Sequence, residues 1–157
     1  MVCNYGGTSK TLCDNDACVN CFERSFASSK KAKCWSNTNI LKPRQVFLSS
    51  SKLVIFNCDK CKHEFELKPS SIKHNNQWCC YCCYSIPKLC PDELCQICLH
   101  KSFASNEKAA YWSNKNVLKP REVHKSTTKK FLFDCDKCAI EFSISPFAVV
   151  CKNWCKL

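Results

Sequence analysis

Cysteine dominates the chemistry available to this chain. Of its 157 residues, 18 are cysteine, and several stand in pairs separated by two residues. A thiolate is a good ligand for zinc, and two cysteines spaced in this way can reach one ion from a tight turn. In a chain made in the reducing cytosol, such pairs favour metal over disulfide bonds. The cysteines therefore predict zinc sites of four thiolates each, with disulfide bonds as the alternative.

The strongest candidate site combines two such pairs across a loop. Its predicted ligands are Cys58, Cys61, Cys79 and Cys82. A second site is predicted further along the chain, because Trp78-Cys79 matches Trp154-Cys155 after a deletion of one residue. The predicted ligands of this second site are Cys135, Cys138 and Cys155, with Cys151 as the fourth.

Two further sites are expected at cysteine clusters that precede these pairs. The first would use Cys3, Cys13, Cys18 and Cys21, and the second would use Cys80, Cys90, Cys95 and Cys98. Cys83 is an alternative to Cys80. The four sites together imply about four Zn²⁺ ions as cofactors. They use 16 of the 18 cysteines and leave two without an assigned role, Cys34 and one of Cys80 or Cys83.

The chain repeats itself at a distance of 77 residues. Residues 12–67 align with residues 89–144 without a gap, and 28 of the 56 pairs are identical by direct count. Identity of this extent indicates two copies of one structural unit. The predicted domains are a first zinc-ribbon-like repeat at residues 1–84 and a second at residues 85–157.

Each copy is expected to be a small α+β module stapled by zinc. Aromatic and branched residues predict strands at 53–57 and 64–67, and at 130–134 and 140–144, each pair forming a β-hairpin with a cysteine pair at its tip. Helices are expected at 26–35 and 103–112, capped by Ser25 and Ser102. Short helical turns are expected at 70–74 and 146–150.

These residues resemble those of the zinc-ribbon, treble-clef-like tandem-repeat proteins of giant DNA viruses. The resemblance is carried by Cys18-x2-Cys21, Ser25-Phe26-Ala27, Trp35-Ser36-Asn37, Pro43-Arg44, Phe56-x-Cys58-x2-Cys61 and Trp78-Cys79-Cys80-Tyr81-Cys82. The family closes its unit with a Cys-Pro-Tyr-Cys knuckle, in which Cys80 here replaces the proline. Some members are fused to restriction-nuclease-like domains, so the resemblance implies a role with nucleic acid.

Composition and charge narrow the function. The two glycines, Gly6 and Gly7, exclude glycine-rich phosphate loops, and no pair of catalytic carboxylates or HExxH motif is present, so we expect no enzyme and no small-molecule substrate. The formal net charge of +11 favours an anionic partner such as nucleic acid. The candidate phosphate contacts are Lys42, Arg44, Lys119, Arg121, Lys129 and Lys130.

Zinc would change that charge. A four-thiolate zinc site carries −2, and four of them lower +11 to +3. The alternative function is therefore a small structural component of the virion, a minor capsid or cement protein that acts through contacts with other viral proteins. No apolar run is long enough for a membrane span, and no signal peptide is expected. The expected location is the host cytoplasm or viral factory, or the virion.

Overall fold

The computed structural model describes residues 11–83 and 88–156. The chain forms two compact units, which comprise residues 1–79 and 80–157. Each unit has the same order of elements. A short α-helix is followed by three turns of 3-10 helix, a two-stranded antiparallel hairpin and a second short α-helix. In the described residues, no helix has the length and apolar character that a bilayer span requires.

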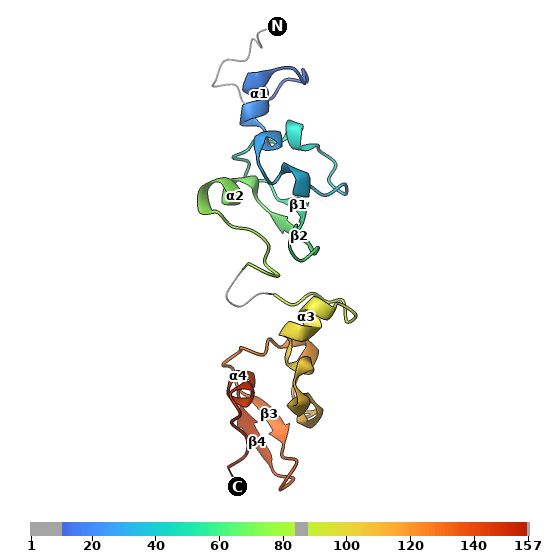
Figure 1. The fold of residues 1–157 in the computed structure, drawn as a ribbon, viewed down its shortest axis with the longest axis vertical. Coiled ribbons are helices and arrows are strands. Elements are labelled where there is room, and N and C mark those ends of the chain that lie inside the picture. The colour runs from blue at the N-terminus through green and yellow to red at the C-terminus, as the bar shows by residue number, and fades with distance from the viewer. Residues whose placement is uncertain (1–10, 84–87, 157) are drawn as a thin grey trace. The chain divides into compact units, whose positions relative to one another are not determined.

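The first unit is built around a short hairpin. Helix α1 spans Val19–Arg24, strand β1 spans Val54–Asn57, strand β2 spans Glu64–Leu67, and helix α2 spans Pro69–Asn75 (Figure 1). The strands pair antiparallel, with Val54 opposite Leu67 and Asn57 opposite Glu64. The 3-10 turns cover Phe26–Ser28, Ala32–Cys34 and Pro43–Gln45.

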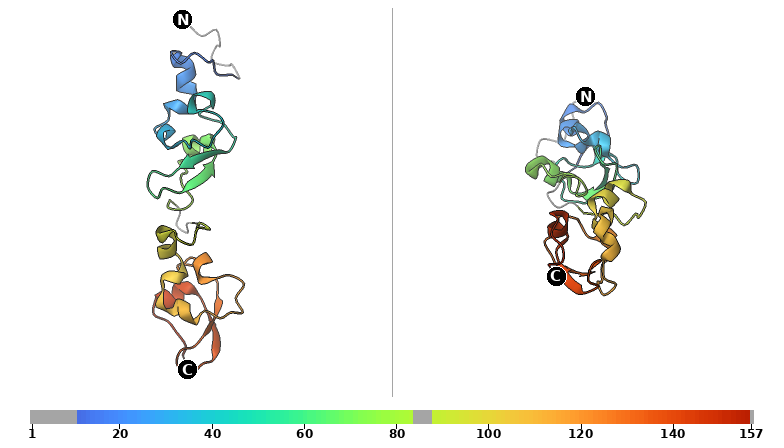
Figure 2. Two further views of the ribbon diagram at one scale, coloured as in Figure 1. Left: turned by 90° about the vertical axis from the view of Figure 1, so that its right-hand side faces the viewer. Right: turned by 60° about the horizontal axis from the view of Figure 1, so that its bottom comes forward.

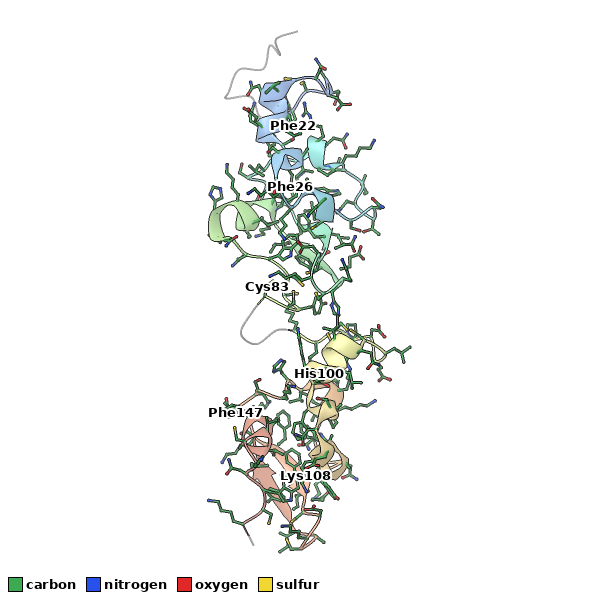
Figure 3. All side chains as sticks on the ribbon, viewed as in Figure 1. Phe22, Phe26, Cys83, His100, Lys108 and Phe147 are labelled. Atoms are coloured by element: carbon green, nitrogen blue, oxygen red, sulfur yellow. The ribbon has the colours of Figure 1, made fainter. Side chains whose placement is uncertain are left out.

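Aromatic rings fill the interior of the first unit. Phe26 and Phe56 are fully buried, and their ring centroids lie 5.3 Å apart. Trp35 meets Phe56 edge to face at 5.5 Å, and Phe65 meets Trp78 in the same way at 5.0 Å. Figure 3 shows Phe26 among the side chains of this unit. Alternation along β1 explains the arrangement, because every second residue of a strand faces the core.

The second unit has equivalent elements. Helix α3 spans Gln96–Lys101, strand β3 spans Phe131–Asp134, strand β4 spans Glu141–Ile144, and helix α4 spans Pro146–Val150 (Figures 1 and 2). The 3-10 turns cover Phe103–Ser105, Glu107–Tyr111 and Pro120–Glu122. Buried Phe103 and Phe133 pack at 5.5 Å between ring centroids, with Val123, Phe131 and Val149 completing the buried cluster.

The predicted strands and the short helical turns after them are confirmed, and every end agrees within one residue. The predicted helices at 26–35 and 103–112 are wrong. Both segments consist of separate 3-10 turns, because an extended residue follows the first turn in each: Ser29 has ψ of 140°, and so does Asn106. Phe26 also donates its backbone N–H to the Val46 carbonyl at 2.7 Å, a long-range bond that no continuous helix requires.

The expected capping by serine is also wrong. Ser25 and Ser102 are fully buried, and neither side chain caps the turn that follows. Their hydroxyls donate backwards to the Phe22 and Leu99 carbonyls, both at 2.7 Å. They therefore close the ends of α1 and α3, the helices that carry the preceding cysteines.

Candidate metal centres

The first hairpin carries a group of four cysteines at its tip. Cys58 follows β1, and its N–H donates to the His63 carbonyl at 2.9 Å, which closes the turn. Lys62, directly after Cys61, has φ of 62°, in the left-handed region that costs a residue with a Cβ about 1–2 kcal/mol. Ala139 takes the same conformation, with φ of 58°, in the second unit. Such strain persists only where the surrounding structure determines the turn.

The sulfur atoms of this group fit a tetrahedral zinc site. The Sγ atoms of Cys58, Cys61, Cys79 and Cys82 all lie within 4.8 Å of one another. Four thiolates at about 2.3 Å from zinc would be about 3.8 Å apart. Cys61 Sγ and Cys79 Sγ are separated by 3.5 Å, which is close to that edge and far from the roughly 2.05 Å of a disulfide. The donor set and its spacing therefore suit zinc. We call this group the first hairpin cluster.

An aspartate inside the cysteine pair ties this cluster to the rest of the unit. Asp59 accepts a hydrogen bond from Lys31 Nζ at 2.7 Å and another from Trp78 Nε1 at 3.0 Å. The bond from Lys31 and the second one from Trp78 hold the pKa of the Asp59 carboxyl below its usual value. Lys31 Nζ also lies 4.2 Å from the centre of the Trp78 ring. Since Trp78 precedes Cys79, these contacts position the second cysteine pair against the hairpin tip.

The second unit has a corresponding group with three cysteines. The Sγ atoms of Cys135, Cys138 and Cys155 lie within 4.8 Å of one another, and Cys138 Sγ is 3.7 Å from Cys155 Sγ. The Lys137 backbone N–H donates to Cys135 Sγ at 3.4 Å. This bond, together with hydrogen bonds from Cys138 and Cys155, lowers the pKa of the Cys135 thiol to about 7. A thiol with a lowered pKa is more readily ionised for metal binding. We call this group the second hairpin cluster.

The same supporting contacts recur around the second hairpin cluster. Asp136 accepts hydrogen bonds from Lys108 Nζ at 2.6 Å and from Trp154 Nε1 at 2.8 Å. Lys108 Nζ lies 4.9 Å from the centre of the Trp154 ring. The structure does not bring the expected fourth ligand, Cys151, into this group: Cys151 is exposed and stands directly after α4.

Two groups of three cysteines lie at the starts of the short helices. Cys18 precedes α1 and Cys21 lies within it, so the two share one helix face, and Cys13 N–H donates to Cys21 Sγ at 3.4 Å. These sulfurs also lie within 4.8 Å of one another. The second unit has the same arrangement at α3, formed by Cys90, Cys95 and Cys98. We call these groups the first and second opening clusters.

The thiols of the second opening cluster differ in their ionisation. Burial raises the pKa of Cys98 to about 11. The pKa of Cys95 is lowered, chiefly by the hydrogen bond from the Cys98 backbone N–H. A buried thiolate without a neighbouring cation is costly. A metal ion that replaces the thiol proton removes this cost, so Cys95 and Cys98 also suit a metal ion.

An arginine covers each opening cluster. Arg44 Nη2 donates to the Asn15 carbonyl at 3.0 Å and lies 4.0 Å from Cys13 Sγ. Arg121 Nη2 donates to the Asp92 carbonyl at 2.6 Å and lies 3.8 Å from Cys90 Sγ. In both arginines Nε is buried and has no hydrogen-bond partner in the described part of the chain. A guanidinium group with a buried nitrogen favours negative charge beside it, which a metal–thiolate group would supply.

Other predicted ligands fall outside these groups. Cys3 lies outside the described residues. Neither Cys80 nor Cys83 belongs to the second opening cluster, and Cys83 Sγ instead lies 3.5 Å from Cys82 Sγ, beside the first hairpin cluster. Cys34 is buried, and burial raises the pKa of its thiol. It is therefore a core residue of the first unit.

The predicted phosphate contacts divide into two kinds. The side chains of Lys42, Lys119, Lys129 and Lys130 are exposed and make no ion pair within the described residues. Arg44 and Arg121 are half-buried and turned towards the opening clusters. Sequence reasoning missed this role of the arginines, and it missed the contacts of Asp59 and Asp136. The recurrence of Asp and Lys at equivalent positions was the one available signal for the latter.

The chain is similar in sequence to a viral protein. No protein-family model matches the chain. Over 138 residues the chain is 38% identical to an uncharacterized protein of Acanthamoeba polyphaga mimivirus. The alignment covers 88% of this chain and 33% of that protein, so the chain spans about a third of the length of its relative. This similarity supports the viral part of the resemblance. The chain is related to a giant-virus protein, and its described residues contain four cysteine groups that could hold metal ions.

Proposed function

We propose that the chain is a tandem of two zinc-ribbon-like modules that bind nucleic acid without catalysing a reaction. The four cysteine groups support the metal part of this proposal. Zinc held by four thiolates has no open position for a reacting water, so the metal would serve to hold the fold. The similarity to a mimivirus protein supports a role in the host cytoplasm or viral factory.

The exposed lysines carry the nucleic-acid part of the proposal. Three lysines form ion pairs within the described residues, to Asp59, Asp136 and Glu141. Lys42 and Lys119, at equivalent positions of the two units, are exposed and lack such a pair there. Unpaired lysines at recurrent positions can neutralise phosphates, and release of counterions from those phosphates drives binding. The position of the lysines matters here more than the net charge, because zinc thiolates cancel much of that charge.

Salt dependence of DNA binding tests this proposal. We expect affinity for a DNA duplex to fall steeply with salt concentration. Lys42→Gln and Lys119→Gln should each lower the slope of log K against log salt by about one. Lys73→Gln, an exposed substitution in α2, is the matched control and should leave the slope unchanged. No affinity for the DNA duplex, or an affinity that does not change with salt concentration, would contradict the proposal.

Exposed apolar side chains favour the second candidate, a virion component that acts through protein contacts. Val19 and Leu94 are 67% and 83% exposed. Apolar side chains at the surface can contribute to protein interfaces. This candidate predicts that the protein is present in purified virions and stays with the shell when the genome is released. Its absence from purified virions would exclude it.

A further inference from the structure

One loop in each unit presents an aliphatic side chain almost completely to the surroundings. Ile40 is 99% exposed and Val117 is 98% exposed. The two residues are 77 positions apart, at equivalent places in the two units, and both are β-branched. A single exposed aliphatic residue is common at protein surfaces. Here, however, an aliphatic side chain is almost completely exposed at the same place in both units, and both loops are held in place by hydrogen bonds. This combination is more specific than one exposed aliphatic residue. We call residues 36–42 and 113–119 the apex loops.

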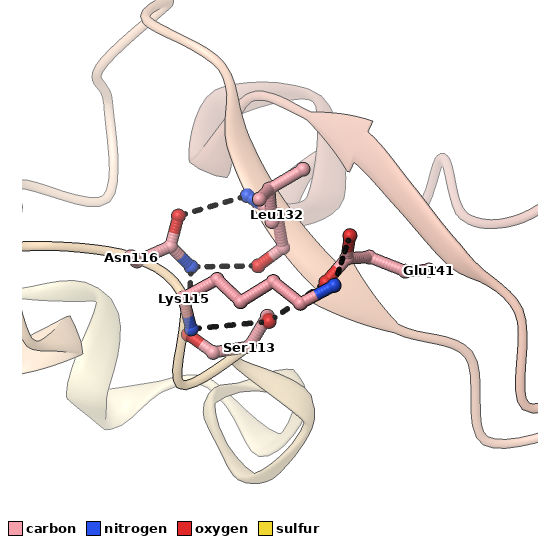
Figure 4. A network of polar contacts seen from close by, with 5 residues as sticks. All are labelled: Ser113, Lys115, Asn116, Leu132 and Glu141. Carbon is pink, nitrogen blue, oxygen red and sulfur yellow. Dashed lines mark hydrogen bonds and ion pairs between the residues drawn. The ribbon is translucent and has the colours of Figure 1, made fainter.

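An asparagine holds each apex loop on the side before the exposed residue. The Asn39 side chain donates to the Ile55 carbonyl at 2.7 Å and accepts from the Ile55 N–H at 2.9 Å. Asn116 does the same with Leu132, at 2.8 and 3.0 Å (Figure 4). Each amide thus satisfies both backbone groups of a residue in β1 or β3, as a neighbouring strand would. The loop is fixed to the hairpin at this point.

A tryptophan holds each loop on the other side of the exposed residue. Trp35 Nε1 donates to the Leu41 carbonyl at 2.9 Å, and Trp112 Nε1 donates to the Leu118 carbonyl at the same distance. The exposed residue therefore lies between two anchored neighbours. A loop whose backbone is already fixed loses little conformational entropy when it is bound, so these loops are preorganised for contact.

A serine and a carboxylate brace the second apex loop further. Ser113 Oγ donates to Glu141 Oε2 at 3.0 Å, and Lys115 Nζ lies 3.1 Å from Glu141 Oε1 (Figure 4). Glu141 belongs to β4, so the loop is joined to both strands of its hairpin. In the first unit Ser36 donates to Glu64 of β2 in the same way. The frame is therefore common to both units.

The surroundings of the exposed residues favour nucleic acid over protein as the partner. Lys42 and Lys119 follow two positions after Ile40 and Val117, and both lysines are exposed. The apolar surface at each apex consists of the exposed residue and one partly exposed neighbour, Leu41 or Leu118, whereas a stable protein interface buries about 800 Å² per partner. A single aliphatic wedge beside a cation is the arrangement by which minor-groove proteins part adjacent base pairs.

We propose that Ile40 and Val117 insert between base pairs of duplex DNA from the minor groove, while Lys42 and Lys119 contact the neighbouring phosphates. This inference rests on the proposed nucleic-acid-binding function and adds the mode of contact. The rigid apex loop holds the wedge in place as the bases unstack. Each unit supplies one wedge.

The test uses the full chain loaded with zinc and an A·T-rich DNA duplex that carries 2-aminopurine, whose fluorescence rises when the base unstacks. Wild-type protein should raise the fluorescence as it binds. Ile40→Ser and Val117→Ser should each weaken binding about tenfold, the contribution of burying one aliphatic side chain. The double variant should abolish the fluorescence rise and leave the salt slope unchanged. Leu94→Ser, an exposed aliphatic outside the apex loops, is the matched control and should behave as wild type.

Zinc content and thermal melting establish that the variants are folded, which these exposed positions should permit. Failure of the wild type to bind DNA would overturn the proposed function itself. Wild-type DNA binding with apex variants of equal affinity and unchanged fluorescence would overturn the wedge and leave the proposed function standing. An oligomer of the wild type that dissociates in the apex variants, seen by analytical ultracentrifugation, would make the apex loops a protein interface and would also overturn the wedge.

Discussion

The two hairpin clusters share a frame and differ in their ligands. In both, a left-handed residue follows the second cysteine of the pair, and an aspartate within the pair accepts bonds from a lysine and a tryptophan. The first brings four cysteines together and the second brings three, among the described residues. Cys61 and Cys79 are buried, whereas the equivalent Cys138 and Cys155 are half-buried. The frame of the site is therefore set by the hairpin and its aromatic support, independently of the fourth sulfur.

The aromatic surroundings differ in the same direction. Trp78 is buried in the first unit, and Trp154 is half-exposed in the second. Tyr111 stands where the first unit has Cys34, and its ring lies 6.2 Å from Trp154 and 5.0 Å from Lys108 Nζ. The second unit thus replaces a buried thiol with aromatic contacts, and its metal site is the more open of the two.

Metal removal should produce the largest difference between the units. Apparent zinc-binding free energies of about 10–16 kcal/mol in small zinc domains exceed the stability that so small a core provides. Chelation should therefore unfold the chain, and the second hairpin cluster, with fewer thiolates, should lose its metal first. Native mass spectrometry during a chelator titration, with circular dichroism in parallel, measures both events.

Removal of one sulfur should make the first hairpin cluster behave like the second. Cys82→Ser should leave three thiolates in the first hairpin cluster and make its chelator sensitivity equal to that of the second. Cys151→Ser, which alters an exposed cysteine outside the cluster, is the control and should change neither site. Loss of a metal ion from Cys151→Ser would show that this residue is a ligand. A fold that survives chelation under non-reducing conditions would favour disulfides.

Core truncation should affect the two units equally, because their buried rings are equivalent. Phe56 and Phe133 are both fully buried, and each packs against the core tryptophan of its own unit. Phe56→Ala and Phe133→Ala should each destabilise the affected unit by about 3–5 kcal/mol. Denaturant unfolding monitored with zinc bound gives this value. A much smaller loss in either unit would mean that its metal sites, rather than its aromatic core, hold the fold.

The sequence predicts those parts of the fold that depend on local pattern. Alternation and aromatic content identify β1 to β4, and the spacing of the cysteine pairs identifies the hairpin tips. The helix expected after Ser25 fails because a buried serine and a long-range bond from Phe26 to Val46 override the helical preference of the alanines and lysines. Local propensity cannot anticipate a contact made across twenty residues.

The candidate sites follow the same division. Ligands within a cysteine pair are brought together as the spacing indicates, whereas the assignments of Cys80 and Cys151 depend on how separate segments meet, and the structure leaves both outside the clusters. The arginines illustrate the limit. Arg44 and Arg121 are of a residue type that commonly contacts phosphate, but each folds back towards a cysteine 31 residues earlier in the chain.

Substitution of these arginines should have an intermediate effect, confined to the opening clusters. Removing a group that supports metal ligands commonly weakens metal binding 10- to 100-fold. Arg44→Gln and Arg121→Gln should weaken it by about that factor at the first and second opening clusters, and should leave both hairpin clusters unchanged. Competition with a chelator of known affinity measures each site. Lys42→Gln and Lys119→Gln, two residues earlier, are the matched controls, and an equal effect in them would reduce the role of the arginines to general charge.

The smallest effect is expected from the indole hydrogen bonds. Trp78→Phe keeps an aromatic ring but removes the donor to Asp59, at a cost of about 0.5–1.5 kcal/mol in stability. Trp154→Phe should cost less because its bond to Asp136 is exposed.

The pKa of Asp59 lies below its usual value partly because of the Trp78 donor, so this pKa should rise in Trp78→Phe. A carboxyl whose pKa is lowered by folding stabilises the protein at pH values above its unfolded-state pKa. That stabilisation is lost as pH falls through the folded-state pKa. The acid limb of unfolding should therefore begin at higher pH in Trp78→Phe. Carboxyl titration by NMR measures the shift, and equal shifts for Asp59 and Asp136 would show that the greater burial of the first site has no energetic consequence.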